Sequence, residues 1–170
     1  MLSQEIRKNI IRPVLQVTDL WSENAEMLVY GTGMIESNYD SLIQIGNPKN
    51  GGLGFWQCEP SDYKDICKWL NNGAKVNSEF NKNLTDRVLA ACYFAVLPSD
   101  PLTLISNIKF ACLICRLHYY RISDPIPSAK DAAALAHYHY KYYNGDGLGK
   151  TNIANNTILF QKLVDEGNGL

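Results

Sequence analysis

Neither sign of charge is in excess in this sequence. Lysine and arginine together number 16, aspartate and glutamate together number 17, and the formal net charge is −1. Proteins that bind nucleic acids usually present a basic face to the phosphates, so this balance gives no support to a nucleic-acid partner. Charged residues make up only 19% of the chain and hydrophobic residues 46%, which excludes an intrinsically disordered protein.

Long hydrophobic runs are missing as well. No apolar stretch approaches the ~20 residues that a helix needs to cross a bilayer, so we expect no membrane span. The N-terminal stretch, MLSQEIRKNIIRPVLQV, carries charges among its apolar residues and has no cleavage site of small residues. It does not read as a signal peptide, and we expect a protein that is made in a cytoplasm.

The cysteines do not form the even, regularly spaced set of a disulfide framework. There are five, scattered along the chain, which is typical of reduced thiols. Cys112 and Cys115 form a C-x-x-C pattern followed by His118, but the segment FACLICRLHYY around them has the composition of one buried helix. A zinc site would need a second pair of ligands. We interpret both cysteines as buried structural residues and expect no metal and no cofactor; a redox or zinc module is the weaker reading.

Apolar residues at helical spacing are what the chain does contain. Its 170 residues are enough for one domain over 1–170 with a full hydrophobic core. Helices are predicted over residues 6–15, 22–36, 60–70, 84–96, 101–120, 128–143 and 152–164. Pro13 is expected to bend or end the first helix, while Ser22 and Ser128 are expected to cap theirs. The segments 84–96 and 101–120 are almost wholly apolar, which predicts a buried central hairpin.

The helical pattern breaks between the second and third of these helices. The segment NPKNGGLG, at residues 47–54, is too rich in glycine to be helical, and the following FWQC predicts a short extended piece. The expected fold class is therefore mainly α, with a small irregular or β-like patch near residues 41–58.

Glu36 stands at the predicted C-terminus of the helix 22–36, in the segment GMIESNYDSL. The negative end of a helix disfavours ionisation of a carboxyl group, and apolar neighbours act in the same direction. A carboxyl group that stays protonated near neutral pH is what a general acid for glycosidic-bond cleavage requires. Gly31 and Gly33 weaken the helix and would leave room for a ligand. The alternative is a solvated Glu36, with glycines that only allow helices to pack closely.

Three blocks of the sequence, IESNYD, GGLGFWQCEPSDY and HYKYYNGDG, resemble the lysozyme-like lytic transglycosylases. That family has a Glu-Ser pair at a helix end, a Gly-x-x-Gln-x-x-Pro loop and a late Tyr-Asn, and the blocks occur here in the same order over residues 33–147. The wider sequence resembles the members of this family carried in bacteriophage particles more than it resembles the bacterial enzymes. The resemblance implies a lysozyme-like helical domain in which Glu36 is the catalytic acid and Ser37 supports it.

The same resemblance implies the residues of a sugar site. Gly54 and Gln57 would shape it, and Tyr143 and Asn144 would close it from a distant helix. The sequence departs from the family pattern at Trp56, where a smaller apolar residue is usual.

Several side chains also fit a sugar polymer by their own chemistry. Tyr39, Trp56 and Tyr143 offer aromatic rings that could stack on pyranose faces. Gln57 and Asn144 can bond hydroxyl and N-acetyl groups both as donors and as acceptors.

Glu59 occupies a position that is usually Met in the family. In an extended stretch, side chains two residues apart point to the same face, so Glu59 faces the cleft if Gln57 does. A second carboxylate there would position a water molecule for hydrolysis. The competing interpretation is that Glu59 only caps the helix that begins at Pro60.

The remaining polar residues of the late helices predict no further site. His137 and His139 are two residues apart, so they point to different faces of a helix and make a poor metal pair. We interpret Arg116, Tyr119 and Arg121 as a buried network that ties their helix to a loop carboxylate.

The leading hypothesis is a peptidoglycan-degrading glycosidase that cleaves the β-1,4 bond between N-acetylmuramic acid and N-acetylglucosamine, as a lytic transglycosylase of a phage particle. Its partners would be the peptidoglycan glycan strand and other virion or tail proteins. It would be made in the host cytoplasm and act at the bacterial cell wall. A near-neutral chain lacks electrostatic attraction to an anionic wall, which fits delivery by a particle. The alternatives are a hydrolytic muramidase that uses Glu59, and a structural virion protein without turnover.

Overall fold

The computed structural model describes residues 2–44, 46, 51–75, 79–144 and 152–167, and it is mainly helical, which confirms the predicted fold class. Its helices are α1 (Leu2–Ile6), the π-helical turn η1 (Arg7–Ile11), α2 (Arg12–Val17), α3 (Glu23–Ser37), α4 (Pro60–Lys75), α5 (Glu79–Cys92), α6 (Thr103–Ser106), α7 (Ile108–Tyr120), α8 (Ala132–Tyr142) and α9 (Ile153–Gly167). In the described residues, no helix is long and apolar enough to cross a membrane.

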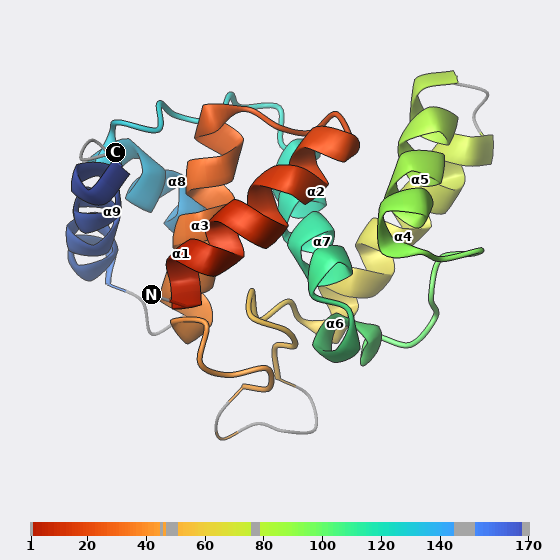
Figure 1. Ribbon diagram of the computed structural model, residues 1–170, viewed down its shortest axis with the longest axis horizontal. Coiled ribbons are helices and arrows are strands. Elements are labelled where there is room, and N and C mark those ends of the chain that lie inside the picture. Colours follow the sequence, from red (N-terminus) through yellow and green to blue (C-terminus); the bar gives the residue numbers. More distant parts are fainter. Residues whose placement is uncertain (1, 45, 47–50, 76–78, 145–151, 168–170) are drawn as a thin grey trace.

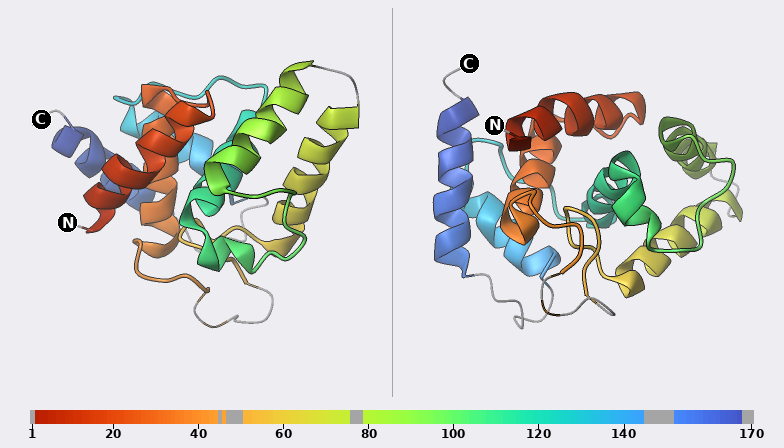
Figure 2. Two further views of the ribbon diagram at one scale, coloured as in Figure 1. Left: turned by 45° about the vertical axis from the view of Figure 1, so that its right-hand side comes forward. Right: turned by 60° about the horizontal axis from the view of Figure 1, so that its bottom comes forward.

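Helices α3 and α7 form the middle of the molecule (Figure 1). Helices α8 and α9 pack together on the side of α3, and α4 and α5 pack together on the side of α7. The N-terminal helices α1 and α2 cross over both central helices. Figure 2 shows the same order from two further directions, and in its left view the coloured part of the chain that follows α3 lies below the central pair.

The first predicted helix does not end at Pro13. The π-helical turn η1 ends at Ile11, and α2 follows it directly. Pro13 is the second residue of α2, which continues to Val17. A proline has no backbone N–H and its ring crowds the preceding turn, so a wider turn there lets the helix pass through it.

Helix α3 begins as the sequence predicts. The Ser22 side chain accepts a hydrogen bond from the Ala25 backbone N–H at 3.1 Å, which confirms the N-cap. The helix ends one residue later than expected, where Asn38 adopts a left-handed conformation and its N–H bonds to Met34 O at 3.1 Å.

The predicted single helix over 101–120 is wrong, because it is interrupted at Asn107. This residue is extended (φ −124°, ψ 94°), its side chain accepts from Phe110 N at 3.0 Å, and it donates to Cys92 O at 3.2 Å. An asparagine side chain that bonds the backbone competes with helix formation, so it ends α6 and begins α7. Similarly, Asp131 rather than Ser128 caps α8, by accepting from Ala134 N at 2.9 Å.

The predicted central hairpin is only half correct. Helix α7 is buried along nearly its whole length, but α5 packs on the outer side of α7 and ends at Cys92. Beyond that end, Tyr93 is 85% exposed and Val96 is 74% exposed. Helix α3 therefore packs against α7 without α5 between them.

The predicted β-like patch consists of isolated antiparallel bridges, Ile43 with Leu53 and Leu53 with Cys58. Between Leu53 and Cys58 the chain makes a tight turn over residues 54–57, so the prediction that FWQC is extended is wrong. Gln57 has φ 47°, a left-handed conformation, and its N–H bonds to Gly54 O at 3.0 Å.

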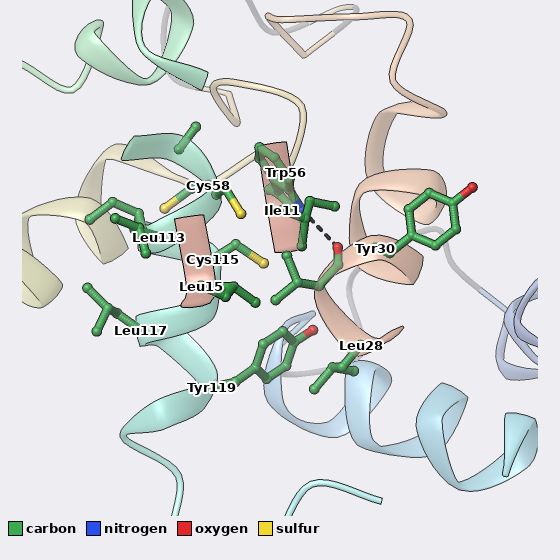
Figure 3. Packing of buried hydrophobic residues seen from close by; sticks show 14 of the residues in the cluster. Ile11, Leu15, Leu28, Tyr30, Trp56, Cys58, Leu113, Cys115, Leu117 and Tyr119 are labelled. Carbon is green, nitrogen blue, oxygen red and sulfur yellow. Dashed lines mark hydrogen bonds between the residues drawn. The ribbon is translucent and has the colours of Figure 1, made fainter. Parts of the chain in front are cut away.

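One contiguous cluster of buried residues extends from the N-terminal helices to α9. Figure 3 shows its centre, where Trp56 from the turn meets residues of η1, α2, α3 and α7. Cys58 and Cys115 lie in the same group, so thiols fill part of the core between α7 and the turn.

Candidate functional site

Glu36 lies in the last turn of α3. Its Oε1 atom is buried, while 16% of the side chain as a whole remains exposed. Solvent therefore reaches the carboxyl group from the side away from Oε1. The end of the helix places a partial negative charge beside this group.

The buried oxygen of Glu36 faces His139, a fully buried residue of α8. The two closest atoms, Glu36 Oε1 and His139 Nε2, are 3.2 Å apart. Despite this short distance, Oε1 accepts no hydrogen bond from the part of the chain that the structure describes. A buried polar oxygen without a hydrogen-bond partner is energetically costly, so this contact is an unusual feature of the site.

The other nitrogen of His139 enters a buried polar chain. Nδ1 is 3.0 Å from the hydroxyl of Tyr119, which is 2.8 Å from the hydroxyl of Thr32. Thr32 in turn donates to Leu28 O at 2.8 Å. These contacts join α8, α7 and α3 and fix the orientation of the imidazole ring.

Ser37 ties the end of α3 to the turn 54–57. Its hydroxyl donates to Phe55 O at 2.7 Å and accepts from Tyr39 N at 3.1 Å. The supporting role that the family resemblance implies for this serine thus has a geometric counterpart, because the bonds hold the turn next to Glu36.

Tyr143 and Asn144 bring the end of α8 to the same place. The Tyr143 hydroxyl donates to Trp56 O at 2.7 Å, and Asn144 Nδ2 lies 3.4 Å from His139 Nε2. The Tyr143 ring stacks on that of His139, with centroids 5.5 Å apart. The late Tyr-Asn pair and the Glu-Ser pair are therefore neighbours in the fold, although about a hundred positions separate them in the sequence.

The prediction that Tyr39 and Trp56 stack on sugars is wrong, because both are in the core. Trp56 is 0% exposed and donates from Nε1 to Val29 O at 2.9 Å, as drawn in Figure 3. Tyr39 is 1% exposed and its hydroxyl donates to Tyr30 O at 3.0 Å. The Tyr143 ring lies against Tyr119 as well as His139, so the structure gives it the role of an anchor and not that of a stacking platform.

The glycines near Glu36 provide space for aromatic packing, not for a ligand. A Cβ atom on Gly31 would collide with the Phe160 ring, and one on Gly33 with the Tyr39 ring. The expected ligand space is therefore wrong and the packing alternative is right. Gly54 has φ +70°, and a Cβ there would lie 2.8 Å from Leu104 O, so the turn and the approach of α6 both require glycine.

Gln57 and Glu59 do not share a face as predicted. Gln57 Nε2 donates to Gly54 O at 2.7 Å and to Ser41 O at 3.3 Å, so this amide braces the turn. The alternation of an extended strand does not apply to a left-handed residue. Glu59 is exposed, and its carbonyl accepts from Tyr63 N at 3.0 Å as the first helical bond of α4, which is the capping position.

The cysteine pattern and the arginine network are both structural. Cys112 and Cys115 are 0% exposed, and burial raises the pKa of both thiols. Among the described residues, no cluster of histidine, cysteine and acidic side chains could hold a metal ion. Arg116 is buried and donates from Nε to Leu20 O at 3.0 Å, so the expected loop carboxylate is a loop carbonyl.

Two hollows lie along α9, and Glu36 is not among the residues that line them. One of about 460 Å³ is bordered by Tyr30, Met34 and Asn38 of the α3 region and by residues of α9. These positions repeat every four residues and lie on the side of α3 opposite Thr32 and Glu36. The candidate site is identified by the buried hydrogen-bonded side chains next to Glu36 and not by the volume of this hollow.

His139, Tyr119 and Thr32 are functional candidates that the sequence analysis missed. The signal for His139 is its spacing, since it follows Ala132, Leu135 and Ala136 on the buried stripe of α8. His139 was considered only together with His137 as a possible metal pair, so its place on the buried stripe was overlooked.

Comparisons of the chain with family models, with curated proteins and with solved structures find no match.

Proposed function

We propose that this chain is a peptidoglycan-cleaving glycosidase in which Glu36 is the general acid. One observation carries the proposal. Glu36 lies in the last turn of α3 with one oxygen buried against His139 and the rest of the carboxyl group within reach of solvent, between the turn 54–57 and the end of α8. A partly buried carboxyl group that solvent can still reach suits proton transfer to a leaving group.

The reaction that fits best is lytic transglycosylation of the β-1,4 bond between N-acetylmuramic acid and N-acetylglucosamine. Glu36 gives its proton to the glycosidic oxygen as the bond from that oxygen to C1 breaks. The resulting carboxylate takes the proton of the C6 hydroxyl of the muramic acid as that oxygen bonds to C1. The product is an anhydro sugar, and Glu36 returns to its acid form.

A single carboxyl group is sufficient for this reaction, whereas hydrolysis by the two-carboxylate route needs a second one. Glu59 was the candidate for that role, and its exposed capping position removes the reason to place it in the site. Transglycosylation is therefore favoured over a hydrolytic muramidase.

The proposed setting is a phage particle that delivers the protein to the bacterial wall. The support is the similarity of the motifs to virion-associated versions and a net charge of −1, which gives no attraction to an anionic polymer. Other virion or tail proteins would then be its partners.

Glu36→Gln is expected to abolish release of muropeptides from purified peptidoglycan while leaving the fold intact. The amide has nearly the same shape but cannot supply a proton, and general acid catalysis is worth about 10²- to 10⁴-fold in rate. Mass spectrometry of the released fragments also identifies anhydro ends, which hydrolysis does not produce. Glu23→Gln is a matched control, because the same change is made at the exposed first residue of the same helix. Equal activity in the Glu36→Gln and Glu23→Gln variants would exclude Glu36 as the acid.

Glu59→Gln is expected to keep the reaction rate and its pH profile and to lose only a little stability. An acidic side chain at a helix N-terminus contributes about 0.3–1 kcal/mol. The two measurements are initial rates of muropeptide release and thermal unfolding. A large drop in rate, together with products that lack anhydro ends, would instead support the hydrolytic mechanism.

A further inference from the structure

We propose that Phe55, in the turn 54–57, is the aromatic platform on which a pyranose ring of the glycan strand packs beside Glu36. The inference rests on the proposed function, because it assigns a substrate-binding residue to the same site. Tyr39 and Trp56 are in the core, so the apolar face of a sugar needs another partner. Phe55 belongs to the same turn as Trp56 but is only partly buried.

The backbone of Phe55 is fixed next to Glu36. Its carbonyl oxygen accepts a hydrogen bond from the hydroxyl of Ser37, the residue that follows Glu36, at 2.7 Å. The next carbonyl of the turn, that of Trp56, accepts from the Tyr143 hydroxyl at 2.7 Å. One bond comes from the helix that carries the proposed acid and the other from the end of α8. The turn therefore cannot shift relative to the candidate site without breaking one of them.

Two buried rings support the ring of Phe55. It meets Tyr39 edge to face, with centroids 5.5 Å apart and planes at 70°, and it meets Trp56 in the same way at 6.5 Å and 69°. Aromatic pairs favour this geometry. A ring that its neighbours already hold loses little conformational freedom when a ligand packs on it. The accessible part of Phe55 is therefore a preformed surface.

The chemistry of this surface indicates what part of the substrate it takes. A phenyl ring offers apolar area and no hydrogen-bonding atom. A β-1,4-linked N-acetylglucosamine unit carries its substituents equatorially, so each face of its pyranose ring presents axial C–H bonds. Phe55 fits such a face and recognises no charge on the strand, so the contact should not weaken when salt is added.

Phe55→Leu and Phe55→Tyr separate sugar binding from simple packing, because leucine keeps an apolar side chain without a flat ring and tyrosine keeps the ring. Loss of a contact made equally in the ground state and the transition state raises KM alone. We expect Phe55→Leu to raise KM for soluble glycan strands about fivefold to tenfold, with kcat nearly unchanged, and Phe55→Tyr to stay within about twofold of wild type.

Phe94→Leu is the matched control. Phe94 is also partly buried and meets the buried ring of Phe110 edge to face at 5.1 Å, but it lies beyond the end of α5. This variant should keep the wild-type KM. Equal KM values for Phe55→Leu and Phe94→Leu would overturn the inference.

A direct contact can be observed without replacing Phe55. The probe is the tetramer of β-1,4-linked N-acetylglucosamine, added to full-length Glu36→Gln protein in which the phenylalanines carry carbon-13. We expect nuclear Overhauser effects between the Phe55 ring and sugar C–H protons, and upfield shifts of those protons. Absence of these contacts, or of binding, would overturn the inference even if Phe55→Leu fails to fold.

The same titration distinguishes failure of this inference from failure of the proposed function. If the tetramer contacts Phe55 but wild-type protein releases no muropeptides, the proposed cleavage fails and the platform stands. If wild-type protein releases muropeptides but the tetramer does not contact the Phe55 ring, the platform fails and the proposed cleavage stands.

Discussion

Tyr39 occupies the space that a methyl group on Gly33 would need. Gly33→Ala is therefore expected to destabilise the protein, although alanine is the better helix former by about 1 kcal/mol. Overpacking a well-filled core costs about 1–3 kcal/mol, because the ring and the backbone of α3 must move apart. Urea unfolding followed by circular dichroism measures the difference.

A smaller side chain at position 39 tests whether collision with the Tyr39 ring causes the loss of stability in Gly33→Ala. Adding Tyr39→Leu to Gly33→Ala relieves the collision, so the double variant should be more stable than the sum of the two single losses predicts. Strictly additive losses would show that Gly33→Ala acts by some route other than contact with Tyr39.

Residue types alone were a poor guide to which aromatic rings are accessible. Tyr39 and Trp56 have the chemistry of sugar platforms, but their polar atoms bond to backbone carbonyls of α3 and their rings fill the core. Ser37 and Tyr143 are different, because the late Tyr-Asn and the Glu-Ser motifs do meet in space. An aromatic side chain with one polar atom suits both a sugar-binding surface and a hydrophobic core, and only its neighbours in the fold decide between the two.

At the scale of elements, Glu26 connects the N-terminal helices to α3. This carboxylate is 1% exposed and accepts hydrogen bonds from Arg7 and Arg12 at 2.8 Å and from Trp21 Nε1 at 2.7 Å. Burial by itself would raise the pKa of Glu26, but the hydrogen bonds from Arg12, Trp21 and Arg7 together lower it below the usual 4.5. The cluster thus stabilises the crossing of the N-terminal segment over α3 only while Glu26 is ionised.

Glu26→Gln is expected to cost about 1–3 kcal/mol near neutral pH, since Arg7 and Arg12 lose a charged hydrogen-bond partner but remain 19% and 48% exposed to solvent. The folded carboxyl group has the lower pKa, so its contribution is complete above the unfolded value and is lost as the pH falls through the folded one. The stability difference between wild type and variant should therefore shrink below about pH 4.5. Chemical unfolding across the acid range measures it, and a gap that stays constant would contradict the assignment.

The helix boundaries show where a local sequence pattern predicts the structure and where it does not. Ser22 caps α3 as predicted because the cap and the first turn are adjacent in sequence. The break at Asn107 was missed because the apolar period continues on both sides of it, and the side chain that ends α6 is held by Cys92 O from another helix. A periodic pattern reports which side of a helix is buried and does not report where the helix is interrupted.

At the scale of the whole molecule, all five thiols lie within one continuous core. Burial raises the pKa of each, for Cys92 to about 12, so few thiolates form at pH 8. We expect the folded protein to react with a thiol reagent slowly and at one common rate, set by opening of the core. Denatured protein should react rapidly at all five. One thiol that reacts rapidly in the folded protein would show that its part of the core opens independently.

The sequence by itself determined the mainly helical class, the absence of helix from the described residues between 41 and 58, the N-cap at Ser22 and the choice of Glu36 as the residue to examine. These depend on spacing and on neighbours within a few positions, which the chain carries locally. The tertiary structure alone decided that His139 faces Glu36, that Tyr119 and Thr32 orient it, and that Trp56 is core. Those contacts join α3, α7, α8 and the turn, and no local period encodes which side chains meet when separate helices pack.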